Sequence, residues 1–244
     1  SAVPLATTGG LDTVAVRMPS HKTARAMIDA AGGYIAAPSA NRSGRPSPTV
    51  ARYVIEDLDG LVDMIIDGGE VNIGLESTII DLTEKVPMIL RPGYITKEML
   101  EEVLGEEVRI DPGIIASDST KKPKAPGMKY KHYAPKADLV LVEGEQEAVV
   151  AEINALVREK QAAGLKVGVV ATDETESLYQ ADYVVTIGAR SDEDAIARHL
   201  YKILREFDDW NVDAIYSESF STPRIGQAIM NRLMKAAGHQ VIHV

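Results

Sequence analysis

The chain has 244 residues, 45% of them hydrophobic and 25% charged, which is enough to bury two ordinary domain cores. It contains no cysteine, which excludes disulfides and thiolate nucleophiles, and its five histidines show no close metal-ligand spacing, so we expect no protein-bound metal. A formal net charge of -10 disfavours stable nucleic-acid binding, because lysine and arginine supply most of the affinity for phosphate backbones. No apolar run approaches the ~18 residues that span a bilayer, and residues 1–10 do not resemble a signal peptide, so we expect a cytoplasmic protein with no membrane partner.

The first half of the chain mixes short apolar strands with amphipathic helices. Hydrophobic patterning predicts strands over residues 13–18, 34–37, 64–67, 77–82 and 88–90. It predicts helices over residues 21–31, 47–55 and 96–104. Ser47-Pro48 is a good start for the second helix, with a capping hydroxyl and a proline at the first position, and Gly105 ends the third.

The pattern breaks over residues 112–136, which we interpret as a linker rich in proline and glycine. Residues 121–136 carry six lysines and no acidic residue, interleaved with Tyr130, His132 and Tyr133. A solvated tether is the usual role for such a segment. Two tyrosines and a histidine favour instead an aromatic, basic strap that lies over a nucleotide.

After the linker, strands and helices alternate regularly. Strands are predicted over residues 139–142, 166–171, 183–186, 214–216 and 240–243, and helices over residues 147–162, 192–207 and 225–236. Strands separated by helices predict a parallel, doubly wound α/β sheet. No G-x-G-x-x-G motif follows a strand, which argues against a dinucleotide-dependent oxidoreductase. Residues 217–226 follow a strand and open a helix, and are either an anion site or an ordinary helix cap.

Several loops of the first half have the residue types of a ligand site. Residues 36–49 lie between a strand and a helix start, and combine small residues, hydroxyls and Asn41 in a pattern suited to phosphate. Residues 74–78 precede a strand, where Ser77 could face a cleft. Arg17 and Arg91 end strands and could bind a carboxylate or phosphate. For each segment taken alone, the more usual role is a cap, a strand entry or a solvated strand end.

Together these segments resemble the threonylcarbamoyl-AMP synthase family in its larger, two-domain form. The resemblance rests on residues 13–17, 36–49, 74–78, 90–93 and 126–135, in that order, and covers essentially the whole chain. It implies part of a YrdC-like α/β twisted-sheet catalytic domain over residues 1–111, a basic and aromatic linker over the active site at residues 112–136, and a Rossmann-like C-terminal domain over residues 137–244.

The resemblance implies a nucleotidyltransferase that makes threonylcarbamoyl-AMP and pyrophosphate from L-threonine, bicarbonate and ATP, with Mg²⁺. A separate transferase complex then passes the threonylcarbamoyl group to the adenosine beside the anticodon of certain tRNAs. No covalent enzyme intermediate is implied, so catalysis is positioning plus stabilisation of phosphate charge.

The family's binding residues carry over motif by motif. The ATP contacts implied by the resemblance are Thr13, Ser39, Asn41, Ser47 and Arg91, with Tyr130 and His132 closing over the nucleotide. The implied threonine contacts are Arg17, which would hold the carboxylate, Ala37 through its backbone, and Ser77.

One family element has no counterpart in the sequence. The family's catalytic domain begins with an N-terminal portion that carries a lysine-x-arginine element for ATP, and residues 1–12 offer no replacement. We expect this portion to have been removed or to come from another chain, and the 244 residues alone to lack part of the ATP site. The alternative to an enzyme is an RNA- or nucleotide-binding module without catalysis, which would use the basic linker as its contact.

Overall fold

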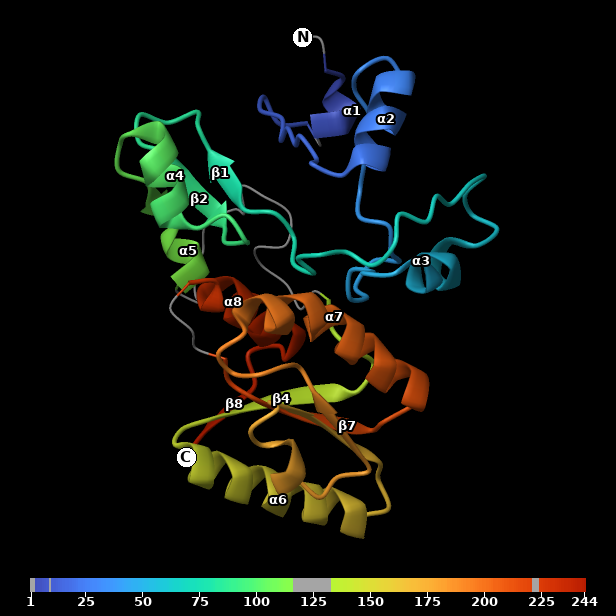
Figure 1. The fold of residues 1–244 in the computed structure, drawn as a ribbon, viewed down its shortest axis with the longest axis vertical. Helices are drawn as coiled ribbons and strands as arrows, with labels where there is room; N and C mark the ends of the chain where they lie inside the picture. Colours follow the sequence, from blue (N-terminus) through green and yellow to red (C-terminus); the bar gives the residue numbers. More distant parts are fainter. Residues whose placement is uncertain (1–2, 9, 116–132, 221–223) are drawn as a thin grey trace.

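The computed structural model describes residues 3–8, 10–115, 133–220 and 224–244, with only the backbone of Ile115. Figure 1 shows an α/β architecture with a small sheet in the N-terminal part (residues 3–115) and a larger sheet in the C-terminal part (residues 133–244). None of the helices in these ranges is both long and apolar enough to cross a membrane.

The C-terminal part is a five-stranded sheet whose strands are all parallel, in the order β6-β5-β7-β4-β8. The strands are β4 (Asp138–Glu143), β5 (Val167–Ala171), β6 (Tyr183–Thr186), β7 (Ala214–Glu218) and β8 (Val241–His243). The connecting elements are α6 (Gln146–Ala162), the short helix η1 (Glu176–Leu178), α7 (Glu193–Trp210) and α8 (Gly226–Ala236). The predicted parallel, doubly wound sheet is confirmed, with element boundaries within three residues of the prediction.

Helices cover both faces of this sheet, as a parallel sheet requires. Figure 1 places α6 on one face and α7 with α8 on the other. The residues of β5 and β7 are buried throughout, because these central strands are covered on both sides. Gly168 in β5 leaves room for the ring of Phe207 on α7, whose Cε1 would lie 2.5 Å from an added Cβ.

The N-terminal part has less regular structure. Its small sheet has the order β1-β2-β3, with β1 and β2 antiparallel and β2 and β3 parallel. These strands are β1 (Ile79–Asp81), β2 (Met88–Arg91) and β3 (Arg109–Ile110). The helices are α1 (Leu5–Thr8), α2 (Lys22–Ala30), α3 (Ala51–Leu58), α4 (Lys97–Leu104) and α5 (Pro112–Ile115). The predictions for α2, β1, β2 and α4 are confirmed, and α4 begins at the Thr96 cap and ends at left-handed Gly105 as expected.

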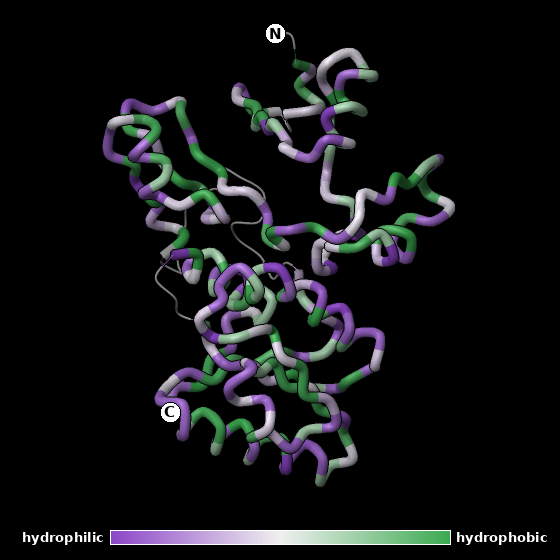
Figure 2. The backbone as a smooth tube through the Cα atoms, viewed as in Figure 1, coloured by the Kyte–Doolittle hydropathy of each residue, from purple (hydrophilic) through white to green (hydrophobic). Residues whose placement is uncertain are grey.

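Three predicted strands of the N-terminal part are wrong. Residues 13–18, 34–37 and 64–67 have no regular secondary structure and form no strand, because none of them pairs with another strand within the described ranges. Their apolar side chains stay exposed, among them Val16 (88%), Met18 (90%) and Tyr34 (85%). Figure 2 shows apolar residues gathered along the C-terminal sheet, and further apolar stretches along the extended segments of the N-terminal part.

The predicted start of the helix at Ser47-Pro48 is also wrong. Helix α3 begins at Ala51, with Val50 as its N-cap and no side-chain cap. The hydroxyl of Ser47 is used elsewhere, because it donates a hydrogen bond to Glu76. The linker prediction also missed α5, which forms at residues 112–115, while the domain boundaries at residues 111 and 136 stay a prediction.

Candidate functional site

The carboxylate of Glu76 is the meeting point of three segments that lie far apart in the sequence. Its Oε1 accepts a hydrogen bond from Ser47 Oγ at 3.1 Å. Its Oε2 accepts from Tyr201 OH on α7 at 3.1 Å and from Arg232 Nε on α8 at 2.8 Å. The Glu76 side chain is only 13% exposed, so α7 and α8 of the C-terminal part hold a largely buried anion of the N-terminal part. We call Ser47, Glu76, Arg91, Tyr201 and Arg232 the Glu76 cluster.

Arg91 holds the residue next to Glu76. It lies at the end of β2, is 7% exposed, and donates from Nε and Nη2 to the carbonyl oxygen of Ser77 at 3.2 and 2.9 Å. Gly93 lets the chain after β2 approach this backbone closely, because an added Cβ would lie 2.4 Å from Thr78 N and 2.7 Å from Glu76 O. The segment before β1 that carries Ser77 is therefore fixed by a buried guanidinium and by close backbone packing.

Electrostatics keep the cluster charged. Burial opposes ionisation of Glu76, but the charge and hydrogen bond of Arg232 outweigh it and hold the pKa of Glu76 below its ordinary value. Burial and then the nearby Glu76 carboxylate raise the pKa of Tyr201 well above its ordinary value, so its hydroxyl remains a donor. Burial, followed by the neighbouring Arg232 charge, lowers the pKa of Lys235 on α8 to about 8.

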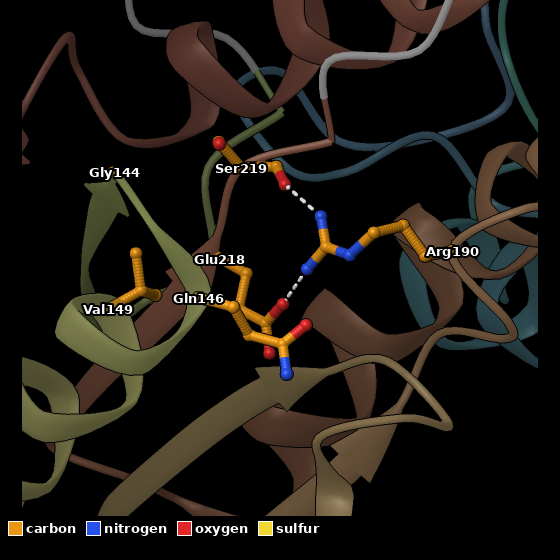
Figure 3. A pocket seen from close by; sticks show the side chains of 6 residues that line it. All are labelled: Gly144, Gln146, Val149, Arg190, Glu218 and Ser219. Atoms are coloured by element: carbon orange, nitrogen blue, oxygen red, sulfur yellow. Dashed lines mark hydrogen bonds and ion pairs between the residues drawn. The ribbon is translucent and has the colours of Figure 1, made fainter.

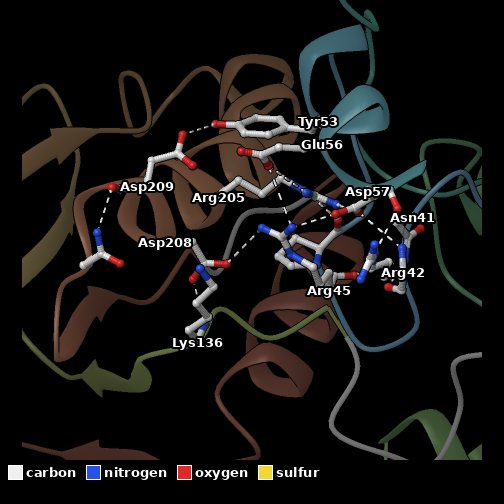
Figure 4. A network of polar contacts seen from close by, with 12 residues as sticks. Asn41, Arg42, Arg45, Tyr53, Glu56, Asp57, Lys136, Arg205, Asp208 and Asp209 are labelled. Atoms are coloured by element: carbon white, nitrogen blue, oxygen red, sulfur yellow. Dashed lines mark hydrogen bonds and ion pairs between the residues drawn. The ribbon is translucent and has the colours of Figure 1, made fainter. Parts of the chain in front are cut away.

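A second polar network holds the loop of residues 36–49 against α7 (Figure 4). Arg205 donates to Pro46 O from Nε at 2.9 Å and from Nη2 at 2.6 Å, and Nη2 also lies 2.6 Å from Asp57 Oδ2. Arg45 Nη1 lies 2.6 Å from the other oxygen of Asp57. Burial opposes ionisation of Asp57, yet the hydrogen bond and charge of Arg205 lower its pKa. Both Arg205 and Asp57 are fully buried, so their pairing satisfies two charges that water cannot reach.

Asn41 shapes the same loop. Its Nδ2 donates to the carbonyl oxygens of Arg42 at 2.9 Å and Arg45 at 3.3 Å, which closes the turn on itself. Its Oδ1 is buried and has no hydrogen-bond partner among the described residues. An unused buried acceptor is costly unless a donor reaches it, so Asn41 has capacity for a ligand hydroxyl or amine.

The residues that the sequence singled out fall into two groups. Ser47, Ser77 and Arg91 come together around Glu76, with Asn41 on the adjoining loop. In contrast, Thr13, Arg17, Ala37 and Ser39 are exposed on extended segments. Tyr130 and His132 lie outside the described residues. Arg91 also differs from the prediction of an open strand end, because its guanidinium is buried and already donates to Ser77 O.

Tyr133, near the end of the predicted linker, packs beside the Glu76 cluster. It has a left-handed backbone with φ 65°, and its ring lies 5.4 Å from that of Tyr201, centroid to centroid. Burial and then the Glu76 charge raise the pKa of Tyr133. The end of the linker therefore packs beside the Glu76 cluster.

The anion site suggested for residues 217–226 is not supported. The backbone N–H groups of Arg224 and Ile225, at the start of α8, donate to the Glu193 carboxylate at 3.3 and 2.6 Å, so a side chain of the protein takes the place of an anion. A small cavity of about 200 Å³ lies near the carboxyl ends of the strands instead (Figure 3). Its polar wall is the ion pair of Arg190 with Glu218, and Glu218 also accepts from Tyr179 OH at 2.8 Å.

In the described part of the chain, no three His, Asp or Glu side chains are grouped so that they could hold a metal ion.

Sequence reasoning missed the residues that organise the site: Glu76, Tyr201, Arg205 and Arg232. A signal existed for the two arginines. On α7, Arg205 lies four positions after Tyr201, which places both on one face of the helix. On α8, Arg232 lies three positions after the apolar Ile229 and four before the apolar Ala236. Each helix therefore carries a charge next to its apolar face. A charge there indicates a buried partner, but the partner cannot be named from the helix alone.

The fold and the cluster define an α/β protein in which a domain with a small mixed sheet rests on a parallel-sheet domain that holds its loops. A family model described as "Threonylcarbamoyl-AMP synthase, C-terminal domain" matches residues 95–238, and one described as "Telomere recombination" matches residues 1–93. The chain belongs to the threonylcarbamoyl-AMP synthase family, in its two-domain Sua5 form.

Relatives agree over nearly the whole chain. The chain is 50% identical over 235 residues to the threonylcarbamoyl-AMP synthase of Bacillus subtilis, covering 96% of this chain and 66% of that protein. It is 48% identical over 242 residues to the one of Pyrococcus abyssi, covering 99% of this chain and 69% of that protein. The crystal structure of P. abyssi Sua5 complexed with L-threonine matches with a TM-score of 0.89 at 48% identity, over 99% of this chain and 69% of that one. The chain thus spans about two thirds of the length of these relatives.

Proposed function

We propose that this chain carries substrate-binding segments of an L-threonylcarbamoyladenylate synthase. The observation that carries the proposal is the Glu76 cluster, which brings Ser47, Ser77 and Arg91 together in a chain about half identical to named synthases. The reaction uses L-threonine, bicarbonate and ATP. A P. abyssi relative of the same fold has been solved with L-threonine, which supports the amino-acid substrate.

The proposed chemistry needs no covalent enzyme intermediate. The amine of threonine forms a C–N bond with the carbon of bicarbonate, water leaves, and the carbamate oxygen then attacks the α-phosphate of ATP. The bond between the α- and β-phosphates breaks and pyrophosphate leaves. Hydroxyls, amides and guanidinium groups position the reactants and stabilise phosphate charge. In this proposal Mg²⁺ enters with the triphosphate, because phosphate oxygens are ligands that Mg²⁺ prefers.

The residue roles are part of the same proposal. Arg17 holds the carboxylate of threonine. The backbone of Ala37 and the residue Ser77 complete the threonine site. ATP is contacted by Thr13, Ser39, Asn41, Ser47 and Arg91, and the unpartnered Oδ1 of Asn41 supports a donor from the nucleotide. Tyr130 and His132 close over the nucleotide as part of a strap, for which the packing of Tyr133 beside the cluster gives support.

The product would pass to a separate tRNA threonylcarbamoyl transferase complex, in the cytoplasm where ATP and tRNA meet. The protein itself then has no need of a tight tRNA surface, in keeping with its net charge of -10.

The test is pyrophosphate release by the product of the complete reading frame that contains this chain. Release should require both threonine and bicarbonate, and Arg17→Ala should raise the KM for threonine far more than that for ATP, because a lost hydrogen bond to a charged group costs about 1.5 to 3 kcal/mol. Arg109→Ala is the matched control, since Arg109 is 57% exposed on β3 and pairs with neighbouring Glu107.

Equal turnover without threonine would contradict the assignment. Salt-sensitive RNA affinity with no ATP turnover would instead support an RNA-binding module.

A further inference from the structure

Two arginines of the C-terminal part are buried almost completely at its contact with the N-terminal part. Arg205 on α7 is 0% exposed and Arg232 on α8 is 1% exposed. Both guanidinium groups donate to backbone carbonyls of the N-terminal part, Arg205 to Pro46 O and Arg232 to Glu76 O. An apolar side chain of similar volume often stabilises such a contact equally well or better than a buried ion pair. Stability alone is therefore a weak reason for these arginines, and their targets indicate a second one.

The target of Arg232 lies in the peptide unit that precedes Ser77. Arg232 Nη2 donates to Glu76 O at 3.1 Å, and this carbonyl belongs to the same planar peptide as the N–H of Ser77. Fixing the carbonyl thus fixes the direction of that N–H. The next peptide is held in the same way, because Arg91 donates to Ser77 O. Guanidinium groups therefore set both peptide planes that flank Ser77.

The Glu76 carboxylate extends this control to the neighbouring loop. It accepts from Ser47, which lies at the end of the 36–49 loop, while Arg232 and Tyr201 hold its other oxygen. Arg205 holds the carbonyl of Pro46, the residue immediately before Ser47. The two segments proposed to contact threonine and ATP are thus positioned from α7 and α8.

We propose that the C-terminal part is a positioning domain for the substrate site, and that Arg232, through Glu76, sets the orientation of Ser77 toward threonine. Arg232 is a positioning residue in this scheme, because it acts through its hydrogen bonds to the side chain and the carbonyl oxygen of Glu76. The inference rests on the proposed function for the identity of the ligand, L-threonine.

The experiment measures L-threonine binding by calorimetry, together with thermal stability, in the product of the complete reading frame. Arg232→Met leaves the largely buried Glu76 carboxylate without its ion-pair partner, so it should weaken threonine binding and stability together. Arg232→Met combined with Glu76→Gln removes the unpaired charge, so stability should return toward the wild-type value. The hydrogen bond from residue 232 to Glu76 O is still missing in this double variant, so Ser77 should stay misplaced toward the charged groups of threonine. Losing one hydrogen bond to a charged group weakens binding about tenfold or more, and we expect the threonine Kd to stay at least about tenfold above wild type.

Arg52→Ala is the matched control. Arg52 also crosses to the C-terminal part, pairing with Asp209 at 2.8 Å, but it contacts neither the Glu76 cluster nor the 36–49 loop in this structure. Its threonine Kd should match wild type. Arg232→Lys, which keeps the charge, should restore part of the affinity of Arg232→Met.

The outcomes separate the two proposals. Threonine affinity that recovers together with stability in the double variant would reduce Arg232 to a structural role and overturn the inference. Wild-type protein that binds threonine without forming pyrophosphate would overturn the proposed reaction, while the affinity series would still decide the role of Arg232. Wild-type protein that binds no threonine would overturn both.

Discussion

The two parts of the molecule obtain their order in different ways. In the C-terminal part, the central strands are buried on both faces between α6 and the pair α7 and α8, so apolar packing accounts for the fold. In the N-terminal part, a three-stranded sheet leaves Val16, Met18 and Tyr34 85 to 90% exposed. Its loops of interest are instead fixed by charged contacts with α7 and α8. The loops of the candidate site are therefore held in place by the C-terminal part rather than by an apolar core of their own.

Removing one large side chain from each part, buried in one case and exposed in the other, should give the largest contrast. Phe207 is fully buried and meets Trp210 edge-on, with ring centroids 5.7 Å apart. Phe207→Ala should destabilise the chain by about 3 to 5 kcal/mol, from lost burial and the cavity that remains. Tyr34→Ala should change stability by less than about 0.5 kcal/mol, since the side chain is exposed. Denaturant unfolding of the 244-residue chain measures both, and equal losses would show that residues 34–37 are packed after all.

The buried ion pair between the two parts should matter nearly as much as the core. Arg205→Ala leaves Asp57 fully buried with one partner removed, and breaking such a pair costs about 3 to 5 kcal/mol. Arg205→Met combined with Asp57→Leu replaces both charges with apolar groups and should recover much of this loss. A loss that persists in the double variant would mean that the hydrogen bonds to Pro46 O, rather than the ion pair, hold the loop.

Sequence reasoning succeeded where structure is local and failed where it depends on a distant partner. Hydrophobic period and capping residues were sufficient to predict α4, with Thr96 and Gly105 at its ends, and the five parallel strands of the C-terminal part. The strand at residues 13–18 has the right composition, but a strand forms only against a neighbour. The prediction for Ser47 failed for the same reason. Its hydroxyl donates to Glu76, 29 residues away in the sequence, instead of capping a helix, and local sequence does not encode such a contact.

The candidate site shows the same division. Motifs identified Ser47, Ser77 and Arg91, since their residue types and spacing resemble a known family. The connection between them through Glu76, Tyr201 and Arg232 joins positions up to 156 residues apart, and no local pattern encodes such a pairing. The roles of individual residues toward ATP and threonine stay predictions.

Acid should loosen the contact between the parts before it affects the C-terminal core. The pKa of Glu76 lies below its ordinary value of 4.5 in the folded protein, because Arg232 outweighs burial. The ionised form therefore adds stability that is fully present above pH 4.5 and is lost as pH falls through the lower, folded pKa. Glu76→Gln cannot ionise, so its stability deficit relative to wild type should be constant above pH 4.5 and shrink below it. A deficit that grows in acid would contradict the sign of the shift.

The smallest effect should come from the exposed ion pair that also joins the two parts. Arg52 is 63% exposed and its Nη2 lies 2.8 Å from Asp209 Oδ2, a partner that is 31% exposed. Exposed pairs of this kind contribute about 0.2 to 1 kcal/mol, because water screens the charges and ordering two side chains costs entropy. Arg52→Ala should therefore destabilise the chain by no more than about 1 kcal/mol, and the difference should fall in high salt.

The ring of Tyr53 also lies 4.5 Å from the Arg52 guanidinium carbon, so part of the loss should survive in salt as a cation–π contribution. Denaturant unfolding of the wild type and of Arg52→Ala, each in low and high salt, measures the ion-pair contribution and the cation–π contribution separately. A loss as large as that of Arg205→Ala would show that position across the contact, rather than burial, decides how strongly a charge holds the two parts together.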